Sequence, residues 1–130
     1  DLLLSDADLS DGAALILPGG NPGYINLGAN EIVREWVRRY YAEGRIVAAI
    51  CGAPTVLALS DVARGRAITC HSSVREQMEG YDYRGGNVVE DGCLITGAGA
   101  GVSVEFALAV AARLTDPETL ARIKRGMEFR

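Results

Sequence analysis

Cys51 is the residue of this 130-residue chain best placed to do chemistry, because it stands where an apolar run ends and a helix is expected to begin. Residues 49–53 read Ala-Ile-Cys-Gly-Ala, with a small residue two positions before and two after the cysteine, as a sharp strand-to-helix turn requires. Such a turn holds the side chain clear of the backbone, and the amide groups that begin a helix favour a thiolate. We interpret Cys51 as a nucleophile; a cysteine that only packs in a core is the alternative.

A glycine loop forms the second candidate site. Gly19 and Gly20 follow the apolar run 13–17, so their N–H groups can point at an oxygen that gains negative charge during a reaction. The carboxyl ends of parallel strands meet at one edge of a sheet, where ligands of open α/β sheets bind. The loop and Cys51 are therefore expected to lie together. A turn with no chemical role is the alternative for the loop.

His71 is the only histidine of the chain, and it directly follows an expected strand over 67–70. It should therefore lie at the same edge of the sheet, where it could orient or protonate groups near Cys51. A histidine that is merely hydrogen-bonded into the structure is an equally open interpretation. We expect Cys70 and Cys93 in the core, because both lie in apolar strand patterns. One histidine and no Cys-x-x-Cys pair leave too few ligands for zinc, so no metal is expected.

The elements that must position these residues alternate between strands and helices. The strand candidates are continuous apolar runs, which is typical of strands that are buried on both faces. This pattern predicts an α/β fold with a mostly parallel sheet covered on both faces. Asn30 and Ser103 are expected helix caps. The expected strands cover 13–17, 46–50, 67–70, 87–90 and 93–96, the last two as a hairpin, and the expected helices cover 30–43, 52–59, 73–79, 103–113 and a stretch that begins at 116–117.

The composition excludes several kinds of partner and cofactor. The 13 Lys and Arg residues are outnumbered by 17 Asp and Glu residues, and no basic tract is present, so nucleic acid and anionic membranes are not expected partners. No run of about 18 apolar residues could span a bilayer. Three cysteines without the spacing of a disulfide framework favour a reducing, cytoplasmic setting. Segment 97–102 lacks the third glycine of a dinucleotide-binding loop; we interpret it as a tight backbone approach to the site and expect no cofactor.

Together these motifs resemble the ThiJ/PfpI superfamily, and specifically its parkinsonism-associated deglycase branch. The resemblance is carried by segments 17–21, 48–55, 69–71, 91–97 and 105–109. It implies a flavodoxin-like three-layer sandwich, related to class I glutamine amidotransferases, and a homodimer. Ala100 departs from the family, which commonly has proline there. Gly52 argues against the protease branch, which has histidine directly after the nucleophile.

The resemblance also implies a function for the site. Cys51 would be a reactive, oxidisable nucleophile, His71 a supporting histidine, and the backbone amides of Gly19, Gly20 and Gly52 an anion-binding pocket. The implied activity is a cofactor-free glyoxalase or deglycase that acts on a small 2-oxoaldehyde such as methylglyoxal, or on glycated adducts. The alternative is a non-enzymatic redox sensor or chaperone that uses oxidation of Cys51. A noncatalytic subunit with a vestigial Cys51 is a third possibility.

A further expectation concerns the N-terminal side of the fold. In this family the first strand lies centrally in the sheet, and the helix after it carries a glutamate that hydrogen-bonds the nucleophilic cysteine. Neither feature is found in this sequence. We therefore expect residues 1–130 to be the C-terminal two-thirds of a single domain. The N-terminal segment, about 30 residues or more for one strand-helix-strand unit, would be a companion chain or an omitted stretch.

Overall fold

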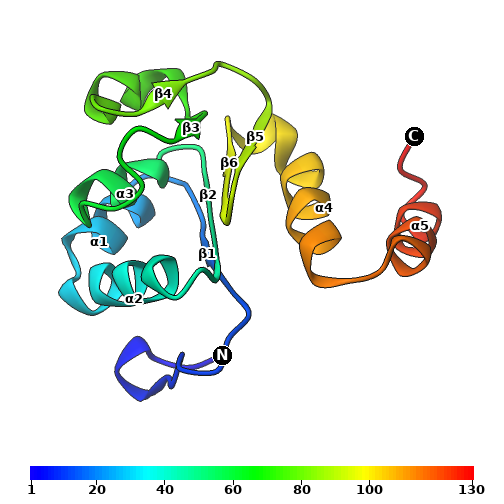
Figure 1. The fold of residues 1–130 in the computed structure, drawn as a ribbon, viewed down its shortest axis with the longest axis horizontal. Coiled ribbons are helices and arrows are strands. Elements are labelled where there is room, and N and C mark those ends of the chain that lie inside the picture. Colours follow the sequence, from blue (N-terminus) through cyan, green and yellow to red (C-terminus); the bar gives the residue numbers. More distant parts are fainter.

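The computed structural model describes residues 1–130 and shows a mainly parallel sheet between helices (Figure 1). Its four strands lie in the order β1-β2-β6-β5, in which the first three are parallel and β5 is antiparallel to β6. The α/β fold and the hairpin expected from the sequence are thereby confirmed. The strands are β1 (Ala14–Leu17), β2 (Ile46–Ile50), β5 (Val88–Asp91) and β6 (Leu94–Gly97).

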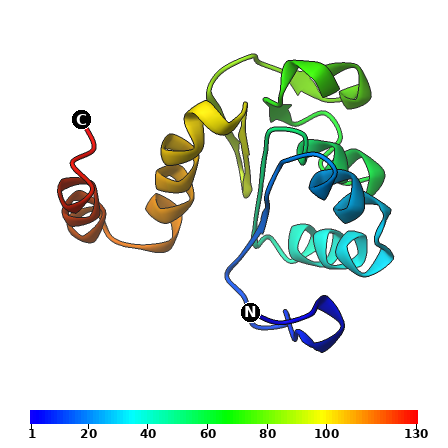
Figure 2. The same cartoon turned by 180° about the vertical axis from the view of Figure 1, so that it is seen from behind.

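Helices cover both faces of this sheet, as Figures 1 and 2 show from opposite sides. On one face lie α1 (Gly23–Ala29), α2 (Glu31–Ala42) and α3 (Pro54–Leu59). On the other face α4 (Ser103–Leu114) packs against β2, β5 and β6, and α5 (Pro117–Gly126) packs against α4, away from the sheet. No helix has both the length and the apolar character needed to cross a bilayer.

The core is divided between the two faces of β2. Side chains of a strand alternate between faces, so Val47 and Ala49 join the core under α2 and α3, whereas Ile46 and Ala48 join the smaller core under α4. All four are buried, which is what the continuous apolar run predicted. At the edge of the sheet, by contrast, Ile16 of β1 is 51% exposed.

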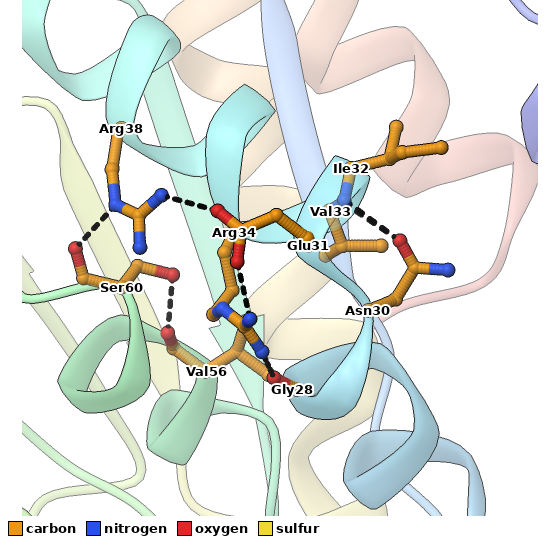
Figure 3. A network of polar contacts seen from close by, with 9 residues as sticks. All are labelled: Gly28, Asn30, Glu31, Ile32, Val33, Arg34, Arg38, Val56 and Ser60. Carbon is orange, nitrogen blue, oxygen red and sulfur yellow. Dashed lines mark hydrogen bonds and ion pairs between the residues drawn. The ribbon is translucent and has the colours of Figure 1, made fainter.

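A polar network joins the three helices on the first face (Figure 3). The side chain of Asn30 accepts from the N–H groups of Ile32 and Val33 at 2.9 and 3.2 Å, so the expected cap of α2 is present. Arg38 donates to the carbonyl oxygen of Ser60, at the end of α3, and also to Glu31 of its own helix. The bond from Arg38 to Ser60 joins α2 to the end of α3, a helix that begins just after Cys51.

The expected strand over 67–70 is shorter than predicted and does not belong to the main sheet. Only residues 67 and 68 form a strand, β3 (Ala67–Ile68). It pairs in parallel with β4 (Asp82–Tyr83) in a separate small sheet. The N–H groups of Ala67 and Thr69 donate to side-chain oxygens of the β5–β6 hairpin and not to backbone carbonyls. The segment therefore forms no backbone ladder with the main sheet.

Several helix boundaries also differ from the expectation. The helix expected from 52 begins at Pro54, because a turn at 51–53 precedes it. Ser103 is the first residue of α4 and no cap; its hydroxyl donates to the carbonyl oxygen of Ala100. The sequence interpretation missed α1 entirely. The short 3-10 helices are η1 (Leu4–Asp6), η2 (Ser72–Met78), which replaces the α-helix expected over 73–79, and η3 (Ala100–Val102).

Candidate active site

Cys51 lies at the carboxyl end of β2 in a strained backbone conformation. Its φ angle is 65°, in the left-handed region that residues with a side chain rarely adopt. The N–H of Cys51 donates to the carbonyl oxygen of Gly97 at 2.9 Å, which fixes this turn to the end of β6. The side chain is half-buried. The sharp turn predicted from the small flanking residues is therefore present.

Gly19 lies directly against the cysteine. A Cβ atom on Gly19 would come within 2.6 Å of the Cβ of Cys51, 2.9 Å of the carbonyl oxygen of Ile50 and 3.4 Å of the Cys51 Sγ. Real Cβ atoms do not approach backbone atoms so closely, so only glycine fits here. The structure thus brings together the glycine loop and the cysteine that the sequence analysis singled out separately.

Three backbone amides around Cys51 have no hydrogen-bond acceptor within the chain. The N–H groups of Gly19, Gly20 and Gly52 donate to no protein atom, whereas those of Cys51 and Ala53 do. Backbone N–H groups are almost always paired with an acceptor, and neighbouring free ones form sites for negatively charged oxygen atoms. The arrangement is suited to hold an oxyanion beside the thiol.

Tyr24 supports this turn, and the sequence analysis did not identify it. A Cβ atom on Gly52 would lie 2.7 Å from Cδ1 and Cε1 of the Tyr24 ring, so the ring packs against the Gly52 backbone. Thr55 adds a second support, since its hydroxyl donates to the carbonyl oxygen of Gly52 at 2.7 Å. Tyr24 belongs to α1, a helix without a recognisable sequence signal.

The segment 67–71 brings His71 to the site through alternating backbone N–H groups. The N–H groups of Ala67 and Thr69 donate to the main sheet, and the N–H of His71 donates to the turn after β2. These bonds hold the backbone of His71 beside the cysteine. The three bonds run from Ala67 to Asp91 Oδ2 at 2.8 Å, from Thr69 to Thr96 Oγ1 at 2.9 Å and from His71 to the carbonyl oxygen of Cys51 at 2.9 Å.

The imidazole of His71 is directed to Ser73 rather than to the thiol. The ring Nδ1 lies 2.8 Å from the Ser73 hydroxyl and accepts from the Ser73 N–H at 3.2 Å, and no hydrogen bond joins the ring to Cys51. A Cβ atom on Gly99 would lie 3.6 Å from the ring Cδ2, so the loop after β6 borders the imidazole. The hydrogen bond between His71 and the cysteine comes from the backbone of His71 and not from its ring.

The two other cysteines differ in their exposure. Cys70 is buried, and this burial raises the pKa of its thiol. Cys93, expected in the core, is half-exposed between β5 and β6. No carboxylate hydrogen-bonds Cys51, and no group of three His, Cys, Asp or Glu residues is arranged to hold a metal ion. None of the surface hollows of the molecule is lined by Cys51, Gly19 or His71.

Comparison with known proteins agrees with this geometry. Residues 1–113 match the family model described as DJ-1/PfpI family. The chain belongs to this family. The recognition made from the cysteine turn and the glycine loop is thereby confirmed, and the flavodoxin-like fold is confirmed by the crystal structure of Drosophila melanogaster DJ-1beta. That structure superimposes with a TM-score of 0.89 at 36% identity and covers 98% of this chain.

The family members similar to this chain carry different names. Protein dj-1beta of Drosophila melanogaster is 36% identical over 96% of the chain. A protein of Caenorhabditis elegans named glutathione-independent glyoxalase DJR-1.2 is 35% identical over 91%, and one of Pyrococcus furiosus named deglycase PfpI is 35% identical over 71%. The chain spans 71%, 63% and 56% of the length of these three relatives.

Proposed function

We propose that Cys51 is the nucleophile of a cofactor-independent glyoxalase or deglycase that acts on methylglyoxal or on glycated adducts. The observation that carries the proposal is the contact between Gly19 and the cysteine, which places unpaired amides around a thiol held in a strained turn. Relatives named as a glutathione-independent glyoxalase and as a deglycase support the same chemistry.

The reaction begins with the thiolate of Cys51. It adds to the aldehyde carbon of methylglyoxal, which forms a C–S bond and turns the carbonyl oxygen into an alkoxide. The amides of Gly20 and Gly52 donate to this oxygen, with Gly19 beside them. Because the amides are fixed by the turn and have no other acceptor, they need no rearrangement as the charge develops. Protonation of the alkoxide gives a hemithioacetal.

A proton then moves between the two neighbouring carbon atoms. A base removes it from the carbon bound to sulfur, and a proton is delivered to the former ketone carbon. The hydroxyl proton passes to the former ketone oxygen, so that the ketone becomes an alcohol and the first carbon becomes a thioester. Water cleaves the thioester C–S bond, releases lactate and restores the thiol. No external oxidant or reductant is consumed. The family resemblance assigns the base to a glutamate of the expected N-terminal segment, and this assignment stays a prediction.

The second candidate function is a redox sensor or chaperone. The unpaired amides that would hold an alkoxide would equally stabilise the oxygens of a sulfenic or sulfinic acid on Cys51. The two functions differ in stoichiometry, because a sensor reacts once with peroxide whereas an enzyme turns over. A homodimer, a cytoplasmic location and a role in oxidative or carbonyl stress remain expectations from the family resemblance.

The test is lactate formation from methylglyoxal by the complete protein, with the expected N-terminal segment included, and by its Cys51→Ala variant. We expect many lactate molecules per chain from the protein and none above background from the variant, with matching circular dichroism spectra. Cys93→Ala is the matched control, because it also removes a half-exposed thiol and should keep the full rate. Retained turnover in Cys51→Ala would overturn the mechanism. No turnover, together with rapid peroxide oxidation of Cys51, would favour the sensor.

A further inference from the structure

His71 and Ser73 form a pair whose hydrogen bonds fix the protonation pattern of the imidazole. The Ser73 N–H donates to Nδ1 at 3.2 Å, and a backbone N–H can only donate. Nδ1 must therefore carry a lone pair in this arrangement. The Ser73 hydroxyl, 2.8 Å from the same nitrogen, then donates as well. In the neutral ring the proton consequently lies on Nε2.

The Cδ2–Nε2 side of the ring lies toward the loop after β6, opposite the Nδ1 atom that Ser73 binds. Nε2 is bonded to Cδ2, and Cδ2 is the ring atom that borders Gly99 in the loop after β6. This loop follows Gly97, whose carbonyl oxygen accepts from the N–H of Cys51. The His71 backbone itself is bonded to the carbonyl oxygen of Cys51. The backbone of His71 thus lies at the same sheet edge as the thiol, the ring is exposed, and no protein atom accepts from Nε2.

We propose that Ser73 is a positioning residue that holds neutral His71 in the Nε2–H tautomer, so that the ring donates a hydrogen bond to the substrate's second oxygen, on the ketone carbon. This inference rests on the proposed function and deepens it. The backbone amides would hold the oxygen next to the C–S bond, and His71 would stabilise negative charge on the neighbouring oxygen during the proton transfer.

The same geometry argues against His71 as the base that deprotonates Cys51. A base at Nε2 would need the other tautomer, in which Nδ1 carries the proton and faces the Ser73 N–H. That tautomer loses a hydrogen bond and brings two N–H groups together. His71 is thereby assigned a donor role, and the abstraction of protons falls to another group.

Nuclear magnetic resonance measures this tautomer directly, because His71 is the only histidine and gives a single imidazole signal set. We expect the ¹⁵N shifts at neutral to basic pH to show an unprotonated Nδ1 and a protonated Nε2. Ser73→Ala keeps the backbone donor and loses the hydroxyl, so the Nδ1–H form should rise measurably. Ser73→Thr, which keeps a hydroxyl, should restore the original shifts. A dominant Nδ1–H tautomer in the unmodified protein would overturn the proposal.

Kinetics test the role of the donor. Ser73→Ala should lower kcat for methylglyoxal about two- to tenfold with little change in KM, the effect of weakening one hydrogen bond, and Ser73→Thr should recover most of it. Ser72→Ala is the matched control, since the Ser72 hydroxyl is exposed and bonds to no group of the site. An unchanged kcat in Ser73→Ala despite a shifted tautomer would overturn the donor role.

The outcomes separate this inference from the proposed function. If the protein shows the Nε2–H tautomer but produces no lactate, the tautomer assignment holds, and both the glyoxalase function and the donor role in it are wrong. If lactate forms in a Cys51-dependent manner while the Nδ1–H tautomer dominates, the function holds and the assignment of Ser73 is wrong. If the amide spectrum of Ser73→Ala changes far from the site, the substitution has disturbed the fold. The comparison is then made between Ser73→Thr, which keeps the hydroxyl, and Ser73→Cys, which lacks it, two side chains that differ little in volume.

Discussion

The carbonyl oxygen of Cys51 accepts a hydrogen bond from the backbone N–H of His71 at 2.9 Å. This bond joins the turn after β2 to the segment that leads out of the small second sheet. The two residues are 20 positions apart in the sequence. Because the bond joins backbone atoms, it holds them together independently of the conformation of their side chains. Three separate segments therefore meet at the site: 51 and 71 are joined by a backbone hydrogen bond, and Gly19 packs directly against Cys51.

Gly19→Ala should remove activity and leave most of the fold intact. The new methyl group would press on the Cβ of Cys51 and the carbonyl oxygen of Ile50, which moves the thiol away from the amides. We expect kcat for methylglyoxal to fall about 10²-fold or more, as when an oxyanion donor is lost, and the free energy of unfolding to fall by about 1–3 kcal/mol. Gly23→Ala is the control, because a Cβ atom there meets nothing. Equal rates for Gly19→Ala and Gly23→Ala would contradict the packing argument.

Cys51→Gly should be more stable than Cys51→Ala. The φ angle of 65° costs a residue with a Cβ atom roughly 1–2 kcal/mol, a cost that glycine does not have. Part of the gain is offset by the greater freedom of glycine in the unfolded chain. We expect a net difference of about 1 kcal/mol in the free energy of unfolding, measured with urea. A less stable Cys51→Gly would show that the turn is not strained in solution.

Much of the fold follows from local sequence patterns. The apolar run at 46–50 and the Asn30 cap lie where the sequence indicated, and the strand expected over 93–96 is found one residue later, at 94–97. Burial of a whole strand and capping by a side chain leave direct traces in the sequence. The proximity of Gly19 and Cys51 was also predictable, since parallel strands end at the same edge of a sheet.

Other features depend on contacts that no local pattern records. The strand expected over 67–70 is interrupted because its N–H groups find acceptors in Asp91 and Thr96, 24 and 27 residues further along the chain. Helix α1 is short and contains Gly28, which packs so closely on α3 that a Cβ atom would lie 2.6 Å from Leu59. The contact between His71 and Ser73 has a local trace, a serine two residues after the histidine, but its geometry depends on η2.

The stabilisation that the Asp91 carboxylate gives to the folded protein should be lost in acid. The hydrogen bond from the Ala67 N–H holds the pKa of the Asp91 carboxyl below its ordinary value, and the Arg66 guanidinium lowers it by a smaller amount. A carboxyl with a lowered pKa in the folded state stabilises the protein above its unfolded pKa of about 3.9, and this contribution is lost as the pH falls through the folded value. Asp91→Asn should therefore show a smaller loss of unfolding free energy between pH 5 and pH 2.5, read from urea titrations. Identical pH dependence in both proteins would contradict the assignment.

Cys70 should be the least reactive of the three thiols. It is buried, and the burial raises the pKa of the thiol, so little thiolate is present at neutral pH. We expect iodoacetamide to leave Cys70 unmodified in the native protein and to modify it rapidly in 8 M urea, a standard denaturing condition, as measured by peptide mass spectrometry. Modification of native Cys70 at the denatured rate would show that the segment 67–71 opens readily.

The most direct test of the account follows turnover and modification of Cys51 in the same sample. Limiting iodoacetamide is added to the native, complete protein with the expected N-terminal segment included. The modified fraction of each cysteine is measured by peptide mass spectrometry, and lactate formation from methylglyoxal is measured on the same sample. The account predicts that activity falls in proportion to modification of Cys51 and reaches zero when that residue is fully modified. Activity that persists in protein with fully modified Cys51, or that falls instead with modification of Cys93, would contradict it.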